Sequence, residues 1–527
     1  MRVWLPCVLL LAACSNILGL SAPREQGDGG VDGGGGGSDA GPTGDFTVRV
    51  TTAKPRVPQN SFDFVDLAVM RSGTFTGPVD LAIPQPPPGV TVTPAIVDSG
   101  SDTGVLELAG NMTLPLGSDL MLDVVASGGG IEHHVTVDAI VVPQPGTLDP
   151  GFGSAGTGVV RTEFAGSNDH SFFNGALANA NGTLVAVGVS EGSPTRAVIA
   201  RYTASGVLDT SFGATGPGFT LDTGDSTSNA FVQLYGVARQ STGNFVCVGQ
   251  SPDGATETSW TDVFDATGHI DQEFGDHFDT GHGEARAVAT LANDSFFVVE
   301  DTNGSGTTIV ERTSTGNPDA AFHGDGSPLP LPIAYAQGVG IGGAQALSLD
   351  ATGAAAYVGG GGATAGEVVR VTAAGALDAA FGNNGIVDVG SGAASITALA
   401  LQHDGNLVVA GAPALVVRML PTGMPDASFG SGGAASLGAT SMASIVGVAI
   451  APDGRIVVAG NSGTGETIVV RLLPDGTLDA SFGTAGVTFV GSFDLSGLAI
   501  APDGGAIGFG LDTSNEPLSA GLFRLSP

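Results

Sequence analysis

One short motif, Gly-x-Leu-Asp-x-x-Phe-Gly with small variations, recurs seven times and divides most of this chain into intervals of similar length. Each copy carries an aspartate and, three residues later, a phenylalanine. These pairs are Asp149 and Phe152, Asp209 and Phe212, Asp271 and Phe274, Asp319 and Phe322, Asp378 and Phe381, Asp426 and Phe429, and Asp479 and Phe482. Successive aspartates lie 48 to 62 residues apart, and this spacing predicts a repeat architecture in which the two residues shape each unit.

The intervals between the motifs share one pattern of strands and turns. In the clearest interval, the apolar runs Ile445–Ala451, Arg455–Gly460 and Thr467–Leu473 are separated by a Pro-Asp-Gly turn and a small polar loop. Asp-Gly between β-branched runs indicates a hairpin, because glycine tolerates positive φ and aspartate caps the turn with its side chain. With the strand expected after each motif, a unit has about four strands, which predicts a β-propeller.

The number of intervals favours a closed ring. The last interval ends in Phe523-Arg524-Leu525, which matches Val470-Arg471-Leu472 of the interval before it, so seven motifs delimit seven complete units. A ring needs whole blades, whereas an open solenoid needs capping repeats with polar outer faces. We therefore expect an all-β chain in which residues 146–527 form a seven-bladed β-propeller of four-stranded blades. An open array of repeats is the alternative.

These motifs together resemble the delta-60 repeat family. The resemblance rests on Leu-Asp-x-x-Phe-Gly, on Asp-Gly-x-Ile/Leu-Val-Val-Ala-Gly and on a Val-Arg-Leu strand; the best copies are Ala449–Gly483 and Ala398–Gly430. It implies propeller-like repeat proteins of bacterial envelopes and secreted proteins, and it implies no defined chemistry. The third and fourth copies depart from the pattern, because Gln272-Glu273-Phe274 is unusually acidic and His323 replaces the final glycine.

Arginine also recurs ahead of the motifs. Arg312 lies four residues before a motif glycine, and five more arginines lie five residues before one or at the matching place in the last strand. These five are Arg201, Arg370, Arg418, Arg471 and Arg524. Guanidinium and carboxylate groups match bidentately, so we expect structural Arg–Asp pairs within or between blades. A functional ring of charges is the alternative.

The charge balance excludes one class of partner. The formal net charge is −34 with 17 basic residues, whereas nucleic-acid binding requires a basic face that displaces counterions. Cys7 lies in the expected leader, so Cys14 and Cys247 give the mature chain no disulfide framework. No glycine-rich phosphate-binding motif lies in a suitable strand–helix context. We expect no nucleic-acid partner and no cofactor.

The N-terminus is typical of an exported, lipid-anchored protein. Residues 1–13 hold one arginine, a short apolar run and small final residues, a pattern of signal peptides that is too short to span a membrane. Leu11-Ala12-Ala13-Cys14 resembles a bacterial lipobox, which implies cleavage before Cys14 and its lipidation; an ordinary secretory leader is the alternative. Residues 14–45 are Gly-rich and are expected to form a disordered tether. We expect membrane attachment in the cell envelope, and Ser15 favours the outer membrane among such lipoproteins.

Residues 46–145 differ from the repeats. Seven short runs of strand-forming residues, separated by proline and glycine turns, predict a β-sandwich. The segment Phe75–Leu81 together with Pro88–Val92 resembles Ig-like modules of bacterial envelope proteins, without the cysteine pair of immunoglobulins. The resemblance implies a spacer or an adhesion role and no catalysis.

One local cluster mixes imidazole and carboxylate groups. His277, Asp279 and His282 are candidate ligands for zinc or another transition metal. A solvated acidic loop is the simpler interpretation of the same residues, and we favour it.

The sequence does not reveal a molecular activity, and no catalytic residue is assigned. The favoured hypothesis is a cell-envelope protein that binds or scaffolds an unknown protein or polysaccharide through the loops or the channel of the propeller. The alternatives are a glycan-active hydrolase or lyase that uses the channel, and a purely structural envelope component. A functional site should break the repeat, so the irregular third and fourth units are where unique polar residues are expected.

Overall fold

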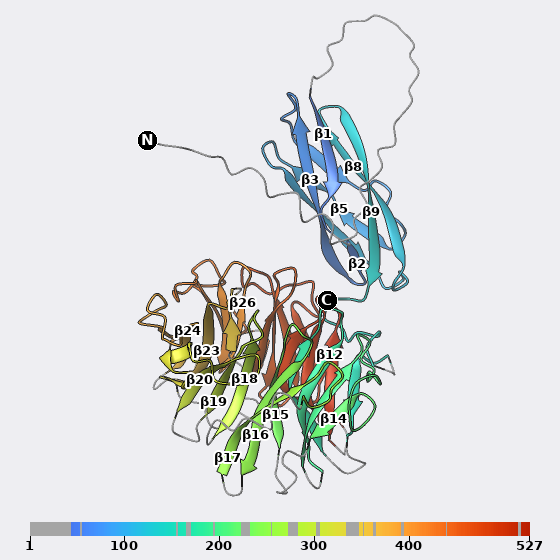
Figure 1. Cartoon of the computed structure of the whole chain (residues 1–527). Coiled ribbons are helices and arrows are strands. Elements are labelled where there is room, and N and C mark those ends of the chain that lie inside the picture. Colours follow the sequence, from blue (N-terminus) through green and yellow to red (C-terminus); the bar gives the residue numbers. More distant parts are fainter. Residues whose placement is uncertain are drawn as a thin grey trace, which may run out of the picture.

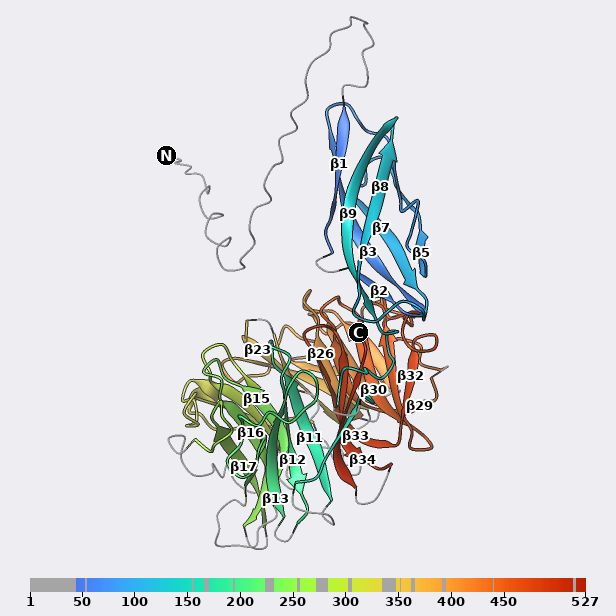
Figure 2. The same cartoon turned by 90° about the vertical axis from the view of Figure 1, so that its right-hand side faces the viewer.

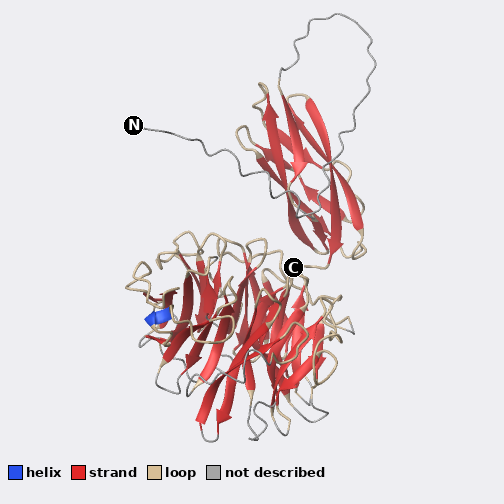
Figure 3. Cartoon of the chain, viewed as in Figure 1, coloured by secondary structure: helices blue, strands red, loops and turns tan. Residues whose placement is uncertain are grey.

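The computed structural model consists almost entirely of β-strands (Figure 3). It describes residues 44–52, 55–153, 156–164, 170–192, 195–222, 232–253, 256–271, 283–301, 306–333, 347–350, 352–361, 365–390, 395–438, 440–514 and 518–527. Within these residues the strands form nine sheets, and the one helical element is a 3₁₀ turn, η1 (Phe322–Gly324). The predicted all-β class is confirmed. No helix among the described residues is long and apolar enough to cross a membrane.

The first two sheets lie within residues 45–142 and enclose one hydrophobic core. Their strand orders are β1 (Asp45–Val50)–β3 (Ser61–Ser72)–β7 (Thr103–Gly110)–β5 (Val90–Thr93), and β2 (Arg56–Pro58)–β9 (Ile131–Val142)–β8 (Asp119–Gly128)–β4 (Val79–Ala82)–β6 (Ala95–Val97). Along β3, Val65, Leu67 and Val69 are buried while Asp66 between them is exposed. β2 and β6 were not predicted, because three residues are too few to show an alternating pattern.

The other seven sheets lie within residues 159–525. Five have four strands, and four of these five are continuous in the sequence: β11 (Ser171–Ala178)–β12 (Leu184–Ser190)–β13 (Arg196–Tyr202)–β14 (Phe219–Asp222), β18 (Glu284–Thr290)–β19 (Phe296–Asp301)–β20 (Thr307–Arg312)–β21 (Leu329–Leu331), β22 (Leu347–Leu349)–β23 (Ala355–Gly361)–β24 (Gly366–Thr372)–β25 (Ile386–Asp388), and β29 (Met442–Ile450)–β30 (Ile456–Ser462)–β31 (Thr467–Leu472)–β32 (Val487–Gly491). Two have three: β15 (Gln233–Arg239)–β16 (Phe245–Asp253)–β17 (Thr256–Phe264), and β26 (Ser395–Leu401)–β27 (Leu407–Ala412)–β28 (Leu415–Met419).

The expectation of four strands in every unit is therefore not met. Between β28 and β29 the described residues form isolated bridges and no strand: Ala434 pairs with Val417 and with Ser431, and Pro425 pairs with Met419. The segment Gly432-Gly433-Ala434-Ala435 lacks β-branched and aromatic residues, so little side-chain packing favours a strand there. In the other three-stranded sheet, residues 272–282, which include the end of the motif and the segment after it, lie outside the described residues.

The seventh sheet combines both ends of the repeat region. β33 (Phe493–Ile500), β34 (Ala506–Asp512) and β35 (Ser519–Leu525) come from the C-terminus, and β10 (Val159–Thr162) pairs with β35 as the outermost strand. The first strands of the seven sheets contact one another in the circular order β33, β11, β15, β18, β22, β26, β29 and back to β33. The sheets are thereby arranged around an axis (Figures 1 and 2).

The N-terminal pair of sheets stands over one side of this ring and contacts it at the last motif (Figures 1 and 2). The Ser61 hydroxyl donates a hydrogen bond of 2.6 Å to the carbonyl of Ser481. The guanidinium of Arg455 lies 3.0 Å from Asp479 in the ring and 3.7 Å from Asp63 on β3. The chain between the two parts is also bonded to the ring, because the N–H of Gly483 donates to the carbonyl of Pro145 at 2.8 Å.

Candidate functional site

Each of the seven motifs makes the same backbone hydrogen bond at its aspartate. The N–H of the motif aspartate donates to the carbonyl of the residue at the matching place in the strand before it, at 2.8 to 3.0 Å. The seven donor–acceptor pairs are Asp149–Arg524, Asp209–Arg201, Asp271–Val263, Asp319–Glu311, Asp378–Arg370, Asp426–Arg418 and Asp479–Arg471. The first pair joins the two ends of the repeat region. We refer to the segment from the aspartate to the phenylalanine of each motif as a corner.

The aspartate side chain fixes the corner through both oxygens. In six corners Oδ1 accepts the N–H two residues later at 2.8 to 3.0 Å, a local hydrogen bond that aspartate forms readily in turns. In five corners Oδ2 lies 2.8 to 3.1 Å from an arginine Nε. These arginines are Arg524, Arg201, Arg370, Arg418 and Arg471. Where arginine is absent, the backbone hydrogen bond still forms, so the arginine reinforces the corner and does not create it.

Several corner arginines also connect one sheet to the next. Arg201 donates to the carbonyl of Ala266, and Arg370 donates to that of Pro421; both acceptors lie in the turn before the following motif. Arg524 donates in the same way to Ala204, which is early in the chain. The corner arginines therefore hold neighbouring sheets together around the ring.

The motif phenylalanines are buried, and each described one lies against the glycine that starts the next motif. Exposure is 0 to 1% for Phe152, Phe212, Phe322, Phe381, Phe429 and Phe482. A Cβ on Gly476 would lie 2.8 Å from the Phe429 ring, and a Cβ on Gly146 would lie 3.0 Å from Phe482. Because Gly476 has φ of 86° and Gly146 has φ of 77°, the motif needs glycine for its backbone conformation and for this close approach.

Two glycines in turns of one sheet allow the requirement for the backbone conformation to be separated from the requirement for close packing. Gly476→Ala and Gly465→Ala place alanine at φ of 86° and 85°, but only Gly476 has atoms within 4 Å of the added methyl group. We expect Gly465→Ala to cost about 1–2 kcal/mol through the left-handed conformation, and Gly476→Ala to cost about 1–3 kcal/mol more through overpacking. Denaturant unfolding followed by the fluorescence of Trp260, a buried residue of β17, measures the difference. Equal losses would contradict the packing role of Gly476.

The third and fourth corners lack arginine. Val263 occupies the arginine place before Asp271, which accepts instead from Asn244 Nδ2 at 3.3 Å. The interpretation of Arg312 as a further member was wrong, because the residue bonded to the Asp319 N–H is Glu311, and Arg312 donates to the carbonyl of Gly316. Burial raises the pKa of Glu311, a hydrogen bond from Ser295 partly offsets this, and the nearby charge of Asp319 raises it further.

The remaining predicted residues cannot be placed. Phe274, the metal candidates His277, Asp279 and His282, and the lipidation candidate Cys14 all lie outside the described residues. Within the described part of the chain, no three His, Cys, Asp or Glu side chains come close enough together to hold a metal ion.

A cavity of about 240 Å³ lies on the axis of the ring, and all seven first strands contribute to its lining. Six of these strands carry a β-bulge at this level, and a bulge leaves one residue unpaired. At the bulges, Asn174 donates to the carbonyl of Leu234 of the next sheet at 2.8 Å, and the guanidinium of Arg286 stacks 4.4 Å from the ring of Tyr235. Tyr235 lies in the sheet that precedes the third motif, and Arg286 lies in the sheet that precedes the fourth.

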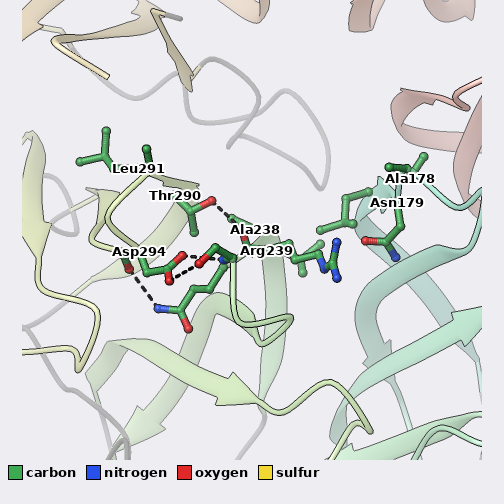
Figure 4. Close-up of a pocket in the computed structure, with 13 residues that line it drawn as sticks. Ala178, Asn179, Ala238, Arg239, Thr290, Leu291 and Asp294 are labelled. Carbon is green, nitrogen blue, oxygen red and sulfur yellow. Dashed lines mark hydrogen bonds between the residues drawn. The ribbon is translucent and has the colours of Figure 1, made fainter. Parts of the chain in front are cut away.

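A second hollow lies next to the axial cavity, where β11, β15 and β18 end; Figure 4 shows residues that line it. This mouth pocket is lined by residues 177–180, 237–241, 290–292 and Asp294, and its volume is about 570 Å³. It adjoins the axial cavity at Val237, which lines both. Its size is in the range of small-molecule and peptide side-chain sites.

Arg239 is the residue of this pocket that departs most from the repeat. It is exposed and directly precedes the turn between the first and second strands of its sheet. At the matching places the other sheets carry small, hydroxyl or aliphatic side chains. These residues are Ala178, Thr290, Leu349, Leu401, Ile450 and Ile500. Arg239 was not predicted from the sequence; an alignment of the seven turns against one another could have found it.

Asn179, which was also not predicted from the sequence, lines the same pocket as Arg239. Figure 4 shows the Asn179 amide on one side of Arg239 and Asp294 on the other. Asn179 is 7% exposed, and its Oδ1 has no hydrogen-bond partner in the described structure. Both oxygens of Asp294 accept hydrogen bonds from Ser241, so this carboxylate serves the structure of the turn.

The ring of small sheets with recurrent corners defines a propeller-like repeat protein. Two segments, residues 180–212 and 451–482, match the model of a family described as a domain of unknown function (DUF5122) beta-propeller. The first segment begins in the turn after β11 and ends at the corner phenylalanine Phe212, and the second begins in the turn after β29 and ends at Phe482. The model therefore corresponds to part of one repeat. This match supports a propeller-like repeat family. No curated protein matches the chain.

Several solved structures show a distant likeness. The PQQ-bound form of an aldose sugar dehydrogenase from Streptomyces coelicolor is 16% identical, with 55% of this chain and 94% of that chain covered and a TM-score of 0.34. A luciferin-regenerating enzyme is 11% identical, with 65% and 98% covered and a TM-score of 0.32. A protein of unknown function from Porphyromonas gingivalis W83 is 12% identical, with 50% and 92% covered and a TM-score of 0.14. Likenesses of this size carry no argument about function.

Proposed function

We propose that this protein is a lipid-anchored protein of the cell envelope whose ring acts as a binding and scaffolding module. In this proposal each of the seven sheets of residues 159–525 is one blade of a closed propeller, and the N-terminal pair of sheets is an Ig-like spacer. The circular order of the first strands and the axial cavity shared by all seven sheets support the blade count.

One observation carries the binding role: the mouth pocket contains a residue that occurs in one sheet alone, whereas the corner residues recur from sheet to sheet. In a ring built from similar sheets, residues that shape the sheets recur, whereas a single binding site requires residues that differ from sheet to sheet. Arg239 is such a residue, and it lines a concave site of ligand size together with Asn179. Binding is favoured over hydrolysis, because the one carboxylate among the lining residues, Asp294, is held by Ser241.

The envelope location rests on the leader, Cys14 and the Gly-rich residues 14–45. A single acyl chain gives marginal membrane affinity of roughly 10⁴ M⁻¹, whereas two or more anchor a protein stably. With the N-terminal sheets above the ring (Figures 1 and 2), the tether and the spacer would carry the mouth pocket away from the membrane. The membrane and an envelope ligand are therefore the proposed partners, and the outer membrane is the proposed site.

The test compares retention of envelope components on the full chain and on a variant with a filled pocket. Ala238→Trp adds bulk within the mouth pocket, and Met121→Trp adds similar bulk on β8, where Met121 is 66% exposed. We expect one component of an envelope extract to bind saturably to the wild type and to Met121→Trp, and to be lost on Ala238→Trp. Equal retention on all three proteins would overturn the role of the pocket, and cleavage of a bound saccharide would favour the glycan-active alternative.

A further inference from the structure

We infer that the mouth pocket recognises the C-terminal carboxylate of a partner polypeptide that ends in an aliphatic residue. This inference rests on the proposed binding function and specifies its ligand. The carboxylate would bind Arg239, the last peptide N–H would donate to Asn179 Oδ1, and the final side chain would lie on the apolar lining. Each of these three contacts follows from a feature of the pocket.

Arg239 is an available cation in a strongly acidic protein. The net charge is −34, and the corner arginines are each occupied by an aspartate. Among the described residues no carboxylate lies within ion-pair distance of Arg239, and its side chain is exposed at the pocket. A guanidinium presents paired N–H donors that match a carboxylate bidentately, so an anionic group is the natural partner for this position.

Asn179 supplies an acceptor that lacks a donor. The hydroxyl of Thr183 gives its proton to Asn181 Oδ1 at 2.7 Å, so its oxygen can only accept from Asn179 Nδ2, at 3.0 Å. This arrangement fixes the amide and leaves Asn179 Oδ1 unpartnered and buried; Figure 4 shows this oxygen on the side that faces Arg239. A buried acceptor without a donor costs free energy, and an N–H next to a bound carboxylate would satisfy it.

The other polar groups of the pocket have partners. Gln240 Nε2 donates to the carbonyls of Asp294 and Ser314, and the Thr290 hydroxyl donates to the carbonyl of Arg239. The rest of the lining consists of aliphatic side chains such as Leu177, Val237 and Leu291. A ligand with one carboxylate, one adjacent donor and an apolar side chain fits this inventory. A sugar acid fits less well, because most of its hydroxyls would have no partner and no aromatic ring lines the pocket for stacking.

The test measures binding of acetyl-Gly-Gly-Val, as the free acid and as the C-terminal amide, to the full chain by calorimetry, with glucuronate as a third probe. We expect saturable binding of the acid that weakens about 10- to 100-fold for the amide and for Arg239→Met, the range for one hydrogen-bonded charge. Arg49→Met removes an exposed arginine on β1 and should leave binding unchanged. An unchanged unfolding midpoint of Arg239→Met shows that the loss is not a folding defect.

Three results would overturn the inference. These are no binding of the acid at millimolar concentration, equal binding of acid and amide, and tighter binding of glucuronate than of the peptide. If Ala238→Trp still abolishes retention of an envelope component in any of these cases, the proposed binding function stands and only the ligand class is wrong. If the envelope component is also retained by Ala238→Trp, both the proposed binding function and the proposed ligand class are wrong.

Discussion

Replacement of Phe482 by alanine is expected to lower the free energy of unfolding by about 3–5 kcal/mol, the usual cost of truncating a fully buried phenylalanine. Phe482 is 1% exposed and lies in one cluster with Val457, Val469 and Leu525. Leu148 and Val159, from the start of the repeat region, pack against the same cluster. The cavity left by the missing ring would therefore open at the place where the two ends of the repeat region meet.

Phe489→Ala provides the matched control. Phe489 lies seven residues later on β32 and is 57% exposed, so its truncation removes little buried surface and should change stability by less than about 0.5 kcal/mol. Denaturant unfolding of the full chain, followed by Trp260 fluorescence, compares the two. Trp260 is a suitable probe because the second tryptophan, Trp4, lies in the expected leader. Comparable losses for both variants would contradict the burial of the corner phenylalanines.

The all-β class could be predicted because the signals that carry it are local. An Asp-Gly turn between two β-branched runs determines a hairpin within about a dozen residues, and the recurrence of one corner motif indicates that the hairpins repeat. Recurrence also singles out the corner aspartates and phenylalanines. The sequence does not show why each motif starts with glycine, because the ring that contacts Gly476 belongs to the preceding motif, at Phe429.

One prediction was wrong because two neighbouring residues are both candidates for the same position in the repeat. Glu311 and Arg312 differ by one residue, and along a strand this difference moves a side chain to the opposite face. Only the hydrogen bond from the Asp319 N–H to the Glu311 carbonyl decides between them. The segment after β28 was a second such case, because its alanines and glycines neither exclude a strand nor favour one.

The mouth pocket could not be predicted from local patterns. Asn179, Arg239 and Asp294 come from three sheets and are far apart in the sequence, and each is an ordinary residue for the end of a strand or a turn. They become a candidate site only because the first strands lie side by side around the axis. A departure from the repeat is visible only after the repeats are aligned on their turns.

Arg471→Met is expected to cost about 3 kcal/mol of stability. Arg471 is buried, its Nε lies 2.8 Å from Asp479 Oδ2, and its guanidinium lies 4.7 Å from the centre of the Phe482 ring. Removal of one partner of a buried ion pair costs about 3–5 kcal/mol, and the lower value is expected because Arg455 still contacts Asp479 at 3.0 Å. Methionine keeps most of the aliphatic stem, so the loss reports on the charge. Arg239→Met, at an exposed position, should change stability by less than about 0.5 kcal/mol.

The loss of stability caused by Arg471→Met should become smaller as the pH falls. Burial alone would raise the pKa of Asp479, but Arg471, Ser481 and Arg455 together lower it below its ordinary value of 3.8. A carboxyl group whose pKa is lowered by folding contributes its full stability above the pKa of the unfolded chain and loses it as the pH falls through the pKa of the folded state. The difference between wild type and variant should therefore be largest near neutral pH and shrink below about pH 3.8. A difference that stays constant down to pH 3 would show that Arg471 acts through packing and not through the charge of Asp479.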